Sequence, residues 1–157
     1  MAKISSLVYQ PARSSHKPPY RYNRVPADAL MLLAGHGIEG DFKAGRSVRR
    51  QLNIMSAAMV AALTAEGFKT APGELGEQIV IDGLDVATLK KGDVLCLGDE
   101  ACIEITMIRT PCEWFEKIQN KTMAEAEGRV GMMAKVIQSG RIKVGDEVAL
   151  KQPEPVV

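Results

Sequence analysis

The stretch DVLCLGDEACIEITMIR, residues 93–109, decides the fold class through the spacing of its apolar side chains. From Ile103 to Met107, apolar residues at odd positions alternate with one glutamate and one threonine, a period typical of a strand with one buried face. Gly98 lies in the turn that separates this run from the apolar run before it. We therefore predict a β-hairpin whose second strand turns its odd positions to the core. Arg109 has the same parity at the end of the strand, so we predict that its side chain is aimed at the mouth of the fold.

Short apolar runs bounded by glycine, proline or aspartate recur outward from this hairpin. They lie at residues 3–9, 29–35, 51–55, 78–81, 131–140 (ending in a turn through Gly140) and 145–151. Ser56 is placed to cap a helix after the third run, and Gly67 is placed to end it. About seven short strands with a few brief helices favour a mainly β fold with helical insertions, an α+β arrangement in the form of a β-barrel or a strongly curved sheet.

Size and charge limit the organisation and the partners of the chain. With 157 residues, 46% of them hydrophobic, it is expected to form a single domain over 1–157, with 152–157 as a flexible tail. The 20 basic residues nearly balance the 19 acidic ones, which gives no global attraction to nucleic acid or to an anionic membrane. No signal sequence or spanning segment stands out, so a cytoplasmic location is expected.

A proline-rich loop at 11–26 interleaves basic side chains with Tyr20 and Tyr22. Such a loop is often only a solvated connection, but basic and aromatic side chains together also suit an anionic ligand. The sequence leaves both interpretations open.

The three cysteines lack the C-x-x-C spacing of zinc and thioredoxin-like sites. Cys96 and Cys102 would face each other across the predicted hairpin. Because a reducing cytosol disfavours disulfides, the favoured interpretation is two small buried hydrophobic side chains.

Cys112 follows a different pattern, because it lies in an apparent helix start. Thr110 could be the N-cap, Pro111 the first helical residue and Glu113 the partner that completes a capping box. Cys112 would then be the second helical residue, where free N–H groups and Arg109 favour a thiolate while the neighbouring glutamate opposes it. On these residues alone, two roles of Cys112 are equally supported. It is either a nucleophile or metal ligand, or a small side chain packed beneath the aromatic residues that follow.

Four ordered blocks carry a resemblance to a known family. They are GIEGD (37–41), RRQLNIMS (49–56), residues 73–112 ending in RTPC, and GRVGMMAKVIQSGRIKVGDEVAL (128–150). Together they resemble the MOSC family, named for the C-terminal domain of molybdenum cofactor sulfurase, in its small standalone form. The resemblance implies a cytosolic protein with the MOSC-type β-barrel that binds the molybdenum cofactor (molybdopterin) or carries sulfur for it.

The resemblance also implies roles for single residues. Cys112 matches the family cysteine that ligates molybdenum in the reduction of N-hydroxylated compounds, or carries a persulfide in sulfur transfer. The candidate cofactor-binding residues are Arg49, Arg50, Lys43, Gln78 and Arg109. Lys43 stands where many small members have histidine, and Gln78 where the family often has asparagine. For Arg49 and Arg50 an exposed salt bridge is an equal alternative.

The same resemblance sets expectations for partners and alternatives. Pyridoxal phosphate is not expected, because it belongs to a separate desulfurase domain of the sulfurase. Partners would be proteins of molybdenum-cofactor biosynthesis or redox proteins. The alternatives are a non-catalytic carrier or binding module that presents a pterin or persulfide to a partner enzyme, and a MOSC-like barrel that has lost its ligand.

Overall fold

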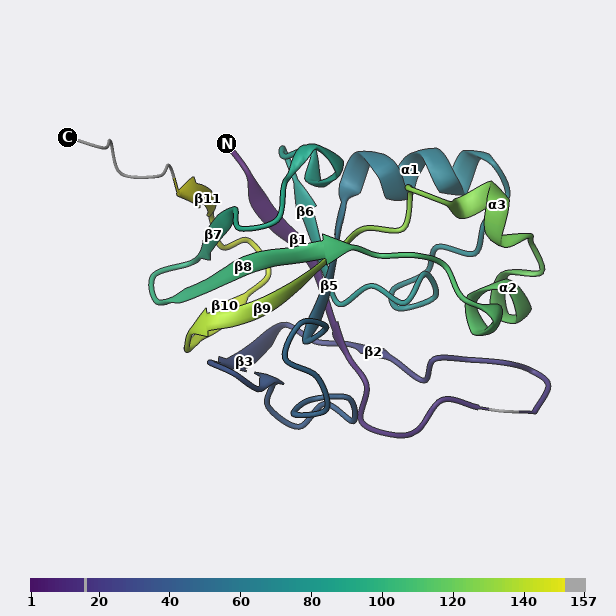
Figure 1. Cartoon of the computed structure of the whole chain (residues 1–157), viewed down its shortest axis with the longest axis horizontal. Helices are drawn as coiled ribbons and strands as arrows, with labels where there is room; N and C mark the ends of the chain where they lie inside the picture. The colour runs from purple at the N-terminus through teal and green to yellow at the C-terminus, as the bar shows by residue number, and fades with distance from the viewer. Residues whose placement is uncertain (16, 152–157) are drawn as a thin grey trace.

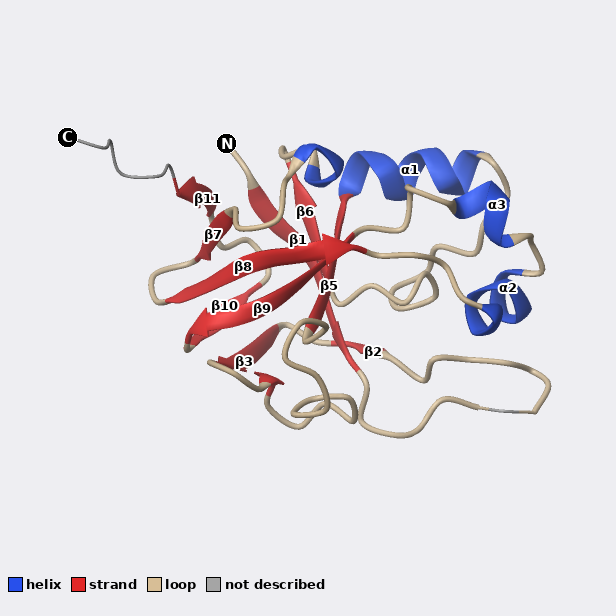
Figure 2. Cartoon of the chain, viewed as in Figure 1, coloured by secondary structure: helices blue, strands red, loops and turns tan. Residues whose placement is uncertain are grey.

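A computed structural model describes residues 1–15 and 17–151, and the predicted tail at 152–157 lies outside this range. Figures 1 and 2 show the arrangement of its elements. In chain order they are β1 (Lys3–Tyr9), β2 (Val25–Pro26), β3 (Ala29–Leu33), β4 (Gly37–Ile38), β5 (Leu52–Ser56), α1 (Ala57–Ala65), β6 (Ile79–Asp82), the 3₁₀ turn η1 (Val86–Thr88), β7 (Val94–Leu97), β8 (Ala101–Ile108), α2 (Glu113–Gln119), α3 (Met123–Ala126), β9 (Met132–Gln138), β10 (Gly140–Lys143) and β11 (Val148–Lys151).

The strands form two sheets. The larger has the order β11-β7-β8-β9-β5-β6-β1-β2, and the smaller has the order β10-β3-β4. Strands β5 and β6, which are joined through α1, pair in parallel, whereas β8 pairs antiparallel with both β7 and β9. Gly140 begins β10 and pairs with Leu32 of β3, so the simple turn predicted there is wrong.

The predicted closed barrel is not confirmed, because the large sheet ends at β11 and at β2. The start of β1 does reach the segment before β11, through the bridge between Lys3 and Glu147 and a 2.9 Å hydrogen bond from Ile4 N to Asp146 O. These contacts bring two regions of the curved sheet together without a continuous ladder. The mainly β fold with few helices is confirmed (Figure 2).

The predicted hairpin is confirmed as β7 and β8, with Leu95 opposite Ile103. Ile103 and Ile105 are fully buried, as their odd positions predict. The alternation then fails, because the β8–β9 register shifts between Ile105 and Met107, and Thr106 is buried instead. Beyond this irregularity β8 leaves the core and leads toward α2 (Figure 1).

The hairpin also corrects the interpretation of two cysteines as unpaired buried side chains. Cys96 and Cys102 are directly opposite in the β7–β8 register and form a disulfide, with their Cα atoms 4.1 Å apart. The antiparallel register, rather than the composition of the chain, determines this pairing.

Helix α1 follows the predicted range, and Gly67 after it has a φ of +89°. Ser56 occupies the N-cap position but makes no side-chain cap; its hydroxyl accepts a hydrogen bond from Val86 N at 2.6 Å. Within the described part of the chain, no helix is long and apolar enough to cross a membrane.

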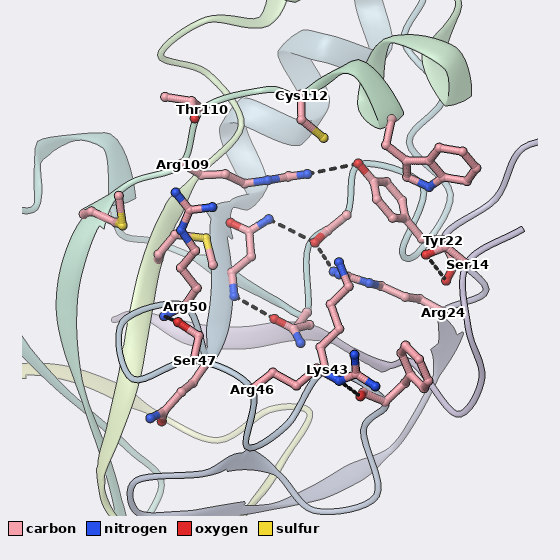
Figure 3. Close-up of a pocket in the computed structure, with 18 of the residues that line it drawn as sticks. Ser14, Tyr22, Arg24, Lys43, Arg46, Ser47, Arg50, Arg109, Thr110 and Cys112 are labelled. Atoms are coloured by element: carbon pink, nitrogen blue, oxygen red, sulfur yellow. Dashed lines mark hydrogen bonds between the residues drawn. The ribbon is translucent and has the colours of Figure 1, made fainter. Parts of the chain in front are cut away.

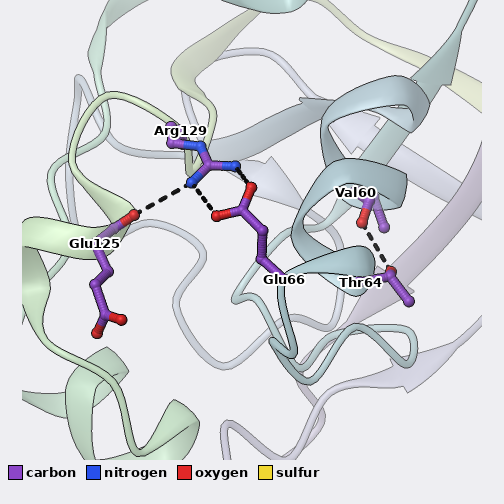
Figure 4. A network of polar contacts seen from close by, with 5 residues as sticks. All are labelled: Val60, Thr64, Glu66, Glu125 and Arg129. Atoms are coloured by element: carbon purple, nitrogen blue, oxygen red, sulfur yellow. Dashed lines mark hydrogen bonds and ion pairs between the residues drawn. The ribbon is translucent and has the colours of Figure 1, made fainter.

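A second, smaller apolar core packs the helices beside the main one. Its members are Met55, Leu63, Phe68, Leu75, Phe115, Ala126 and Val130. Near this core, Glu66 and Arg129 form an ion pair that links the end of α1 to the segment after α3 (Figure 4). This core fixes α2 relative to the sheet, and so fixes the segment between β8 and α2 that carries Cys112.

Candidate functional site

A cavity of about 540 Å³ opens between the loop that joins β1 to β2 and the segment that joins β8 to α2 (Figure 3). Six basic residues line it: Arg13, Arg24, Lys43, Arg46, Arg50 and Arg109. No aspartate or glutamate is among the described residues that line it. The cavity is therefore a local concentration of positive charge in a chain whose net charge is only +1, and such a site favours an anionic ligand.

Arg109 is held by four contacts. Its Nη1 donates to Leu75 O at 2.5 Å and to Val130 O at 3.4 Å, and its Nη2 donates to the Tyr22 hydroxyl at 3.1 Å. Its guanidinium carbon also lies 5.6 Å from the centre of the Phe115 ring. The predicted orientation of Arg109 toward the mouth of the fold agrees with its place in the lining.

Arg24 lies near Arg109 without a carboxylate partner in the cavity. It donates to Gly76 O and, from Nε at 3.4 Å, to Gln10 Oε1. Burial, followed by the charge of Arg109, lowers the pKa of Arg24 to about 10. A bound anion would offset both effects, because it would supply the missing opposite charge.

The loop from Gly73 to Gln78 is the scaffold for both arginines, because its carbonyl groups accept their hydrogen bonds. The loop is itself held by the buried Glu77 carboxylate, which accepts from Gly73 N at 3.0 Å and Leu75 N at 3.2 Å. Burial raises the pKa of Glu77, although these hydrogen bonds oppose the shift. Gly76 has a φ of +80° and leaves no room for a side chain beside Arg109.

Gln78, a predicted cofactor residue, lines the cavity but is partly engaged by the fold. Its Oε1 accepts from Asn53 N at 2.7 Å, and Asn53 Nδ2 donates to Gly76 O at 3.0 Å. Among the described residues, the side-chain Nε2 of Gln78 has no hydrogen-bond partner, although the backbone N of Gln78 donates to Asn53 O. The side-chain Nε2 can therefore donate to a ligand.

The structure separates two neighbouring arginines that the sequence grouped together. Arg50 lines the cavity, whereas Arg49 does not. The carbonyl of Arg49 accepts from Thr106 Oγ1 at 2.5 Å, and its side chain is exposed. Arg49 is therefore not brought to the predicted site.

Lys43 is placed at the cavity as predicted. Burial, followed by the charge of Arg24, lowers its pKa. The carboxylate of Asp41 accepts from Gln10 N at 2.6 Å and from the backbone N of Lys43 at 3.0 Å, and its charge opposes the shift without reversing it.

The helix start predicted around Cys112 is wrong by two residues. Helix α2 begins at Glu113, and Cys112 is its N-cap, with φ −122° and ψ 174°. Thr110 therefore lies two residues before the observed N-cap, and the predicted capping box does not form. Cys112 is an exposed free thiol that lines the cavity, and its sulfur points toward the side chains below it (Figure 3).

Sequence reasoning did not name four of the basic or aromatic cavity residues as site residues: Arg46, and Arg13, Tyr22 and Arg24 from the loop at 11–26. The interleaving of basic and aromatic side chains was the signal in that loop, but a solvated loop was the favoured interpretation. The loop also contacts α2, because the Tyr20 and Trp114 rings meet edge to face with centres 5.3 Å apart. It therefore forms one wall of the cavity.

Comparison with known proteins decides the family. A family model described as MOSC domain matches residues 39–149, well over half of the chain. The chain belongs to the MOSC family. A search of curated proteins gave no match.

Solved structures agree with the MOSC fold. The YuaD protein from Bacillus subtilis has a TM-score of 0.75 at 22% identity, and the match covers 94% of each chain. YiiM from Geobacillus stearothermophilus has a TM-score of 0.74 at 16% identity, covering 97% of this chain and 76% of that one. YiiM from Escherichia coli has a TM-score of 0.68 at 23% identity, covering 99% and 72%. At these identities the likeness establishes the fold alone.

The matched MOSC segment includes Lys43, Arg50, Gln78, Arg109 and Cys112. Tyr22 and Arg24 lie before it. Four of the six cationic side chains that line the cavity therefore lie in the matched segment, and the other two, Arg13 and Arg24, come from the loop before it.

Proposed function

We propose that this MOSC protein binds the molybdenum cofactor in the basic cavity through Cys112 and acts in the reduction of N-hydroxylated compounds. One observation carries the proposal: the only free thiol among the described residues and six cationic side chains line the same cavity. A thiol suits a soft metal ion, and the cations suit the cofactor's phosphate.

The residues present fit such a cofactor. Among the described residues, no three His, Cys, Asp or Glu side chains cluster as a metal site, so a metal on Cys112 would take its other ligands from the cofactor itself. Arg50 and Lys43 would hold the phosphate, and the free amide N–H groups of Gln78 would donate to the pterin. When bound, the cofactor would supply two-electron redox chemistry.

Sulfur transfer is the second candidate, and the exposure of the Cys112 thiol favours it. A persulfide on an exposed thiol can be passed to another protein, whether the chain acts as an enzyme or as a carrier. In either case the expected partners are molybdenum-cofactor biosynthesis proteins or redox proteins, in the cytoplasm, as the family resemblance implies.

Metal and pterin analysis of protein made in a molybdenum-replete host tests the proposal. We expect stoichiometric molybdenum in the wild type and its loss in Cys112→Ala. A double variant, Cys96→Ala with Cys102→Ala, changes two sulfurs outside the cavity and should keep the metal. A wild type with neither molybdenum nor a persulfide on Cys112 would exclude both functions.

The neighbouring arginines provide a second, matched test of the same cavity. We expect Arg50→Met to weaken the binding of inorganic phosphate several-fold and Arg49→Met to leave it unchanged. Both variants remove one exposed positive charge, so an equal effect would show that phosphate responds to net charge and not to the cavity.

A further inference from the structure

The phenol of Tyr22 is a buried polar group inside the cavity. Only 5% of the residue is exposed, although it comes from a loop, and it lines the cavity together with Cys112 and Arg109. Its oxygen accepts the hydrogen bond from Arg109 Nη2. Within the described part of the chain, this is the one hydrogen bond that the phenolic oxygen makes.

The contact with Arg109 fixes what the phenol can offer to a ligand. A guanidinium is only a donor, so Tyr22 must accept from it and its own O–H must point elsewhere. Figure 3 shows the Cys112 sulfur directed toward the Arg109–Tyr22 hydrogen bond, and all three residues line the cavity. The O–H is therefore available to a ligand atom that lies beneath the thiol.

The surroundings keep this phenol protonated. Burial raises the pKa of Tyr22 above its ordinary value of 10.0, and the charge of Cys112 adds to the rise, while Arg109 and Arg24 oppose it. The net direction is upward. Near neutral pH, Tyr22 is therefore a neutral hydrogen-bond and proton donor, and the arginine and lysine side chains that line the cavity with it are cations.

We propose that Tyr22 is a catalytic residue that donates a proton to the oxygen leaving an N-hydroxylated substrate. The inference rests on the proposed reduction. That reaction breaks the N–O bond, takes up two electrons and two protons, and releases the reduced nitrogen compound and water. The electrons come from an external reduced redox protein through the bound cofactor. Tyr22 supplies one proton and regains it from solvent, and the second proton comes from solvent.

The test compares Tyr22→Phe with Tyr20→Phe in molybdenum-loaded protein. Both changes remove one phenolic oxygen from the same loop, but Tyr20 does not line the cavity. In Tyr22→Phe, Arg109 keeps Leu75 and Val130 as acceptors. We expect kcat for an amidoxime to fall by about 100-fold or more, the size of a general-acid contribution, with KM unchanged. Tyr20→Phe should keep the wild-type rate.

Two measurements on the apoprotein do not depend on activity. Ultraviolet difference titration should show one late-ionising tyrosine that is absent from Tyr22→Phe. Inorganic phosphate, followed through the emission of the chain's single tryptophan, Trp114, should bind the wild type and Tyr22→Phe equally. A role limited to holding Arg109 would instead weaken phosphate binding.

The outcomes separate this inference from the function on which it rests. An active wild type with an equally active Tyr22→Phe overturns the role of Tyr22 alone, as does a Tyr22 that ionises with or before the other tyrosines. A loss of phosphate affinity in Tyr22→Phe, alongside the loss of kcat, also overturns it, because Tyr22 would then act through Arg109. A wild type that holds molybdenum and reduces no N-hydroxylated compound overturns both.

Discussion

Replacing Gly76 by alanine should disturb the cavity through Arg109 and Tyr22. The new Cβ would lie 2.5 Å from Arg109 Nη2 and 3.0 Å from Tyr22 Cζ, closer than carbon atoms approach in folded proteins. The end of an arginine side chain can often move aside, but here Leu75 O and the Tyr22 hydroxyl hold it. The substitution must therefore break contacts of Arg109.

The expected cost has two parts. Left-handed backbone costs a residue with a Cβ about 1–2 kcal/mol, and Gly76 has a φ of +80°. Loss of one hydrogen bond to the charged guanidinium adds about 1.5–3 kcal/mol. The free energy of unfolding should therefore fall by roughly 2.5–5 kcal/mol in Gly76→Ala.

Gly35→Ala is the matched control, because Gly35 has a φ of +74° and nothing within 4 Å of an added Cβ. It should lose only the backbone part, about 1–2 kcal/mol. Urea denaturation measures both variants, and phosphate titration should show weaker binding in Gly76→Ala alone. Equal losses of stability, with unchanged phosphate affinity in Gly76→Ala, would refute the reasoning.

Three further expectations concern buried and reactive groups. Because burial raises the pKa of Glu77 above 4.5, the folded chain keeps a proton that the unfolded chain loses; this contribution to stability is therefore lost as pH rises from 4.5. Glu77→Gln should remove this pH-dependent contribution. Denaturation of the wild type and of Glu77→Gln at a series of pH values above 4.5 should therefore give a difference in the free energy of unfolding that changes with pH. A thiol reagent should modify one cysteine in the native protein, Cys112, and the disulfide-bonded Cys96 and Cys102 only after reduction; three native thiols would contradict the disulfide. Phe115→Ala, at a fully buried ring, should cost about 3–5 kcal/mol in unfolding free energy, and a loss below about 1 kcal/mol would show that α2 does not depend on this core.

Local pattern predicted the hairpin and α1 well, because alternation and a terminal glycine are properties of neighbouring residues. The same reasoning failed where a long-range contact decides the result. The register shift between β8 and β9 broke the alternation at Thr106. The hydroxyl of Ser56 bonded to Val86 N instead of capping α1. The disulfide is a different case: the hairpin pattern placed Cys96 opposite Cys102, and the expectation of a reducing cytosol led to the wrong interpretation.

The candidate site was predicted in part for a similar reason. The family blocks brought Cys112 and Arg50 to attention, and both line the cavity. Arg49 stands next to Arg50 in the sequence but does not line the cavity, a difference that adjacent positions on an extended chain cannot reveal without knowing which face is covered. Tyr22 and Arg24 come from a loop whose position depends on contacts with distant segments, including Gly76.

The lining of the cavity begins at Arg13 and ends at Met133, and this spread imposes an order of events on biosynthesis. A ribosome must have released nearly all of this length before the pocket exists, because β9, which carries Met133, lies between β8 and β5 in the sheet. A nascent chain that lacks β9 cannot form the complete lining. A ligand that needs the whole cavity would therefore bind only after β9 has been synthesised and has paired with its neighbours.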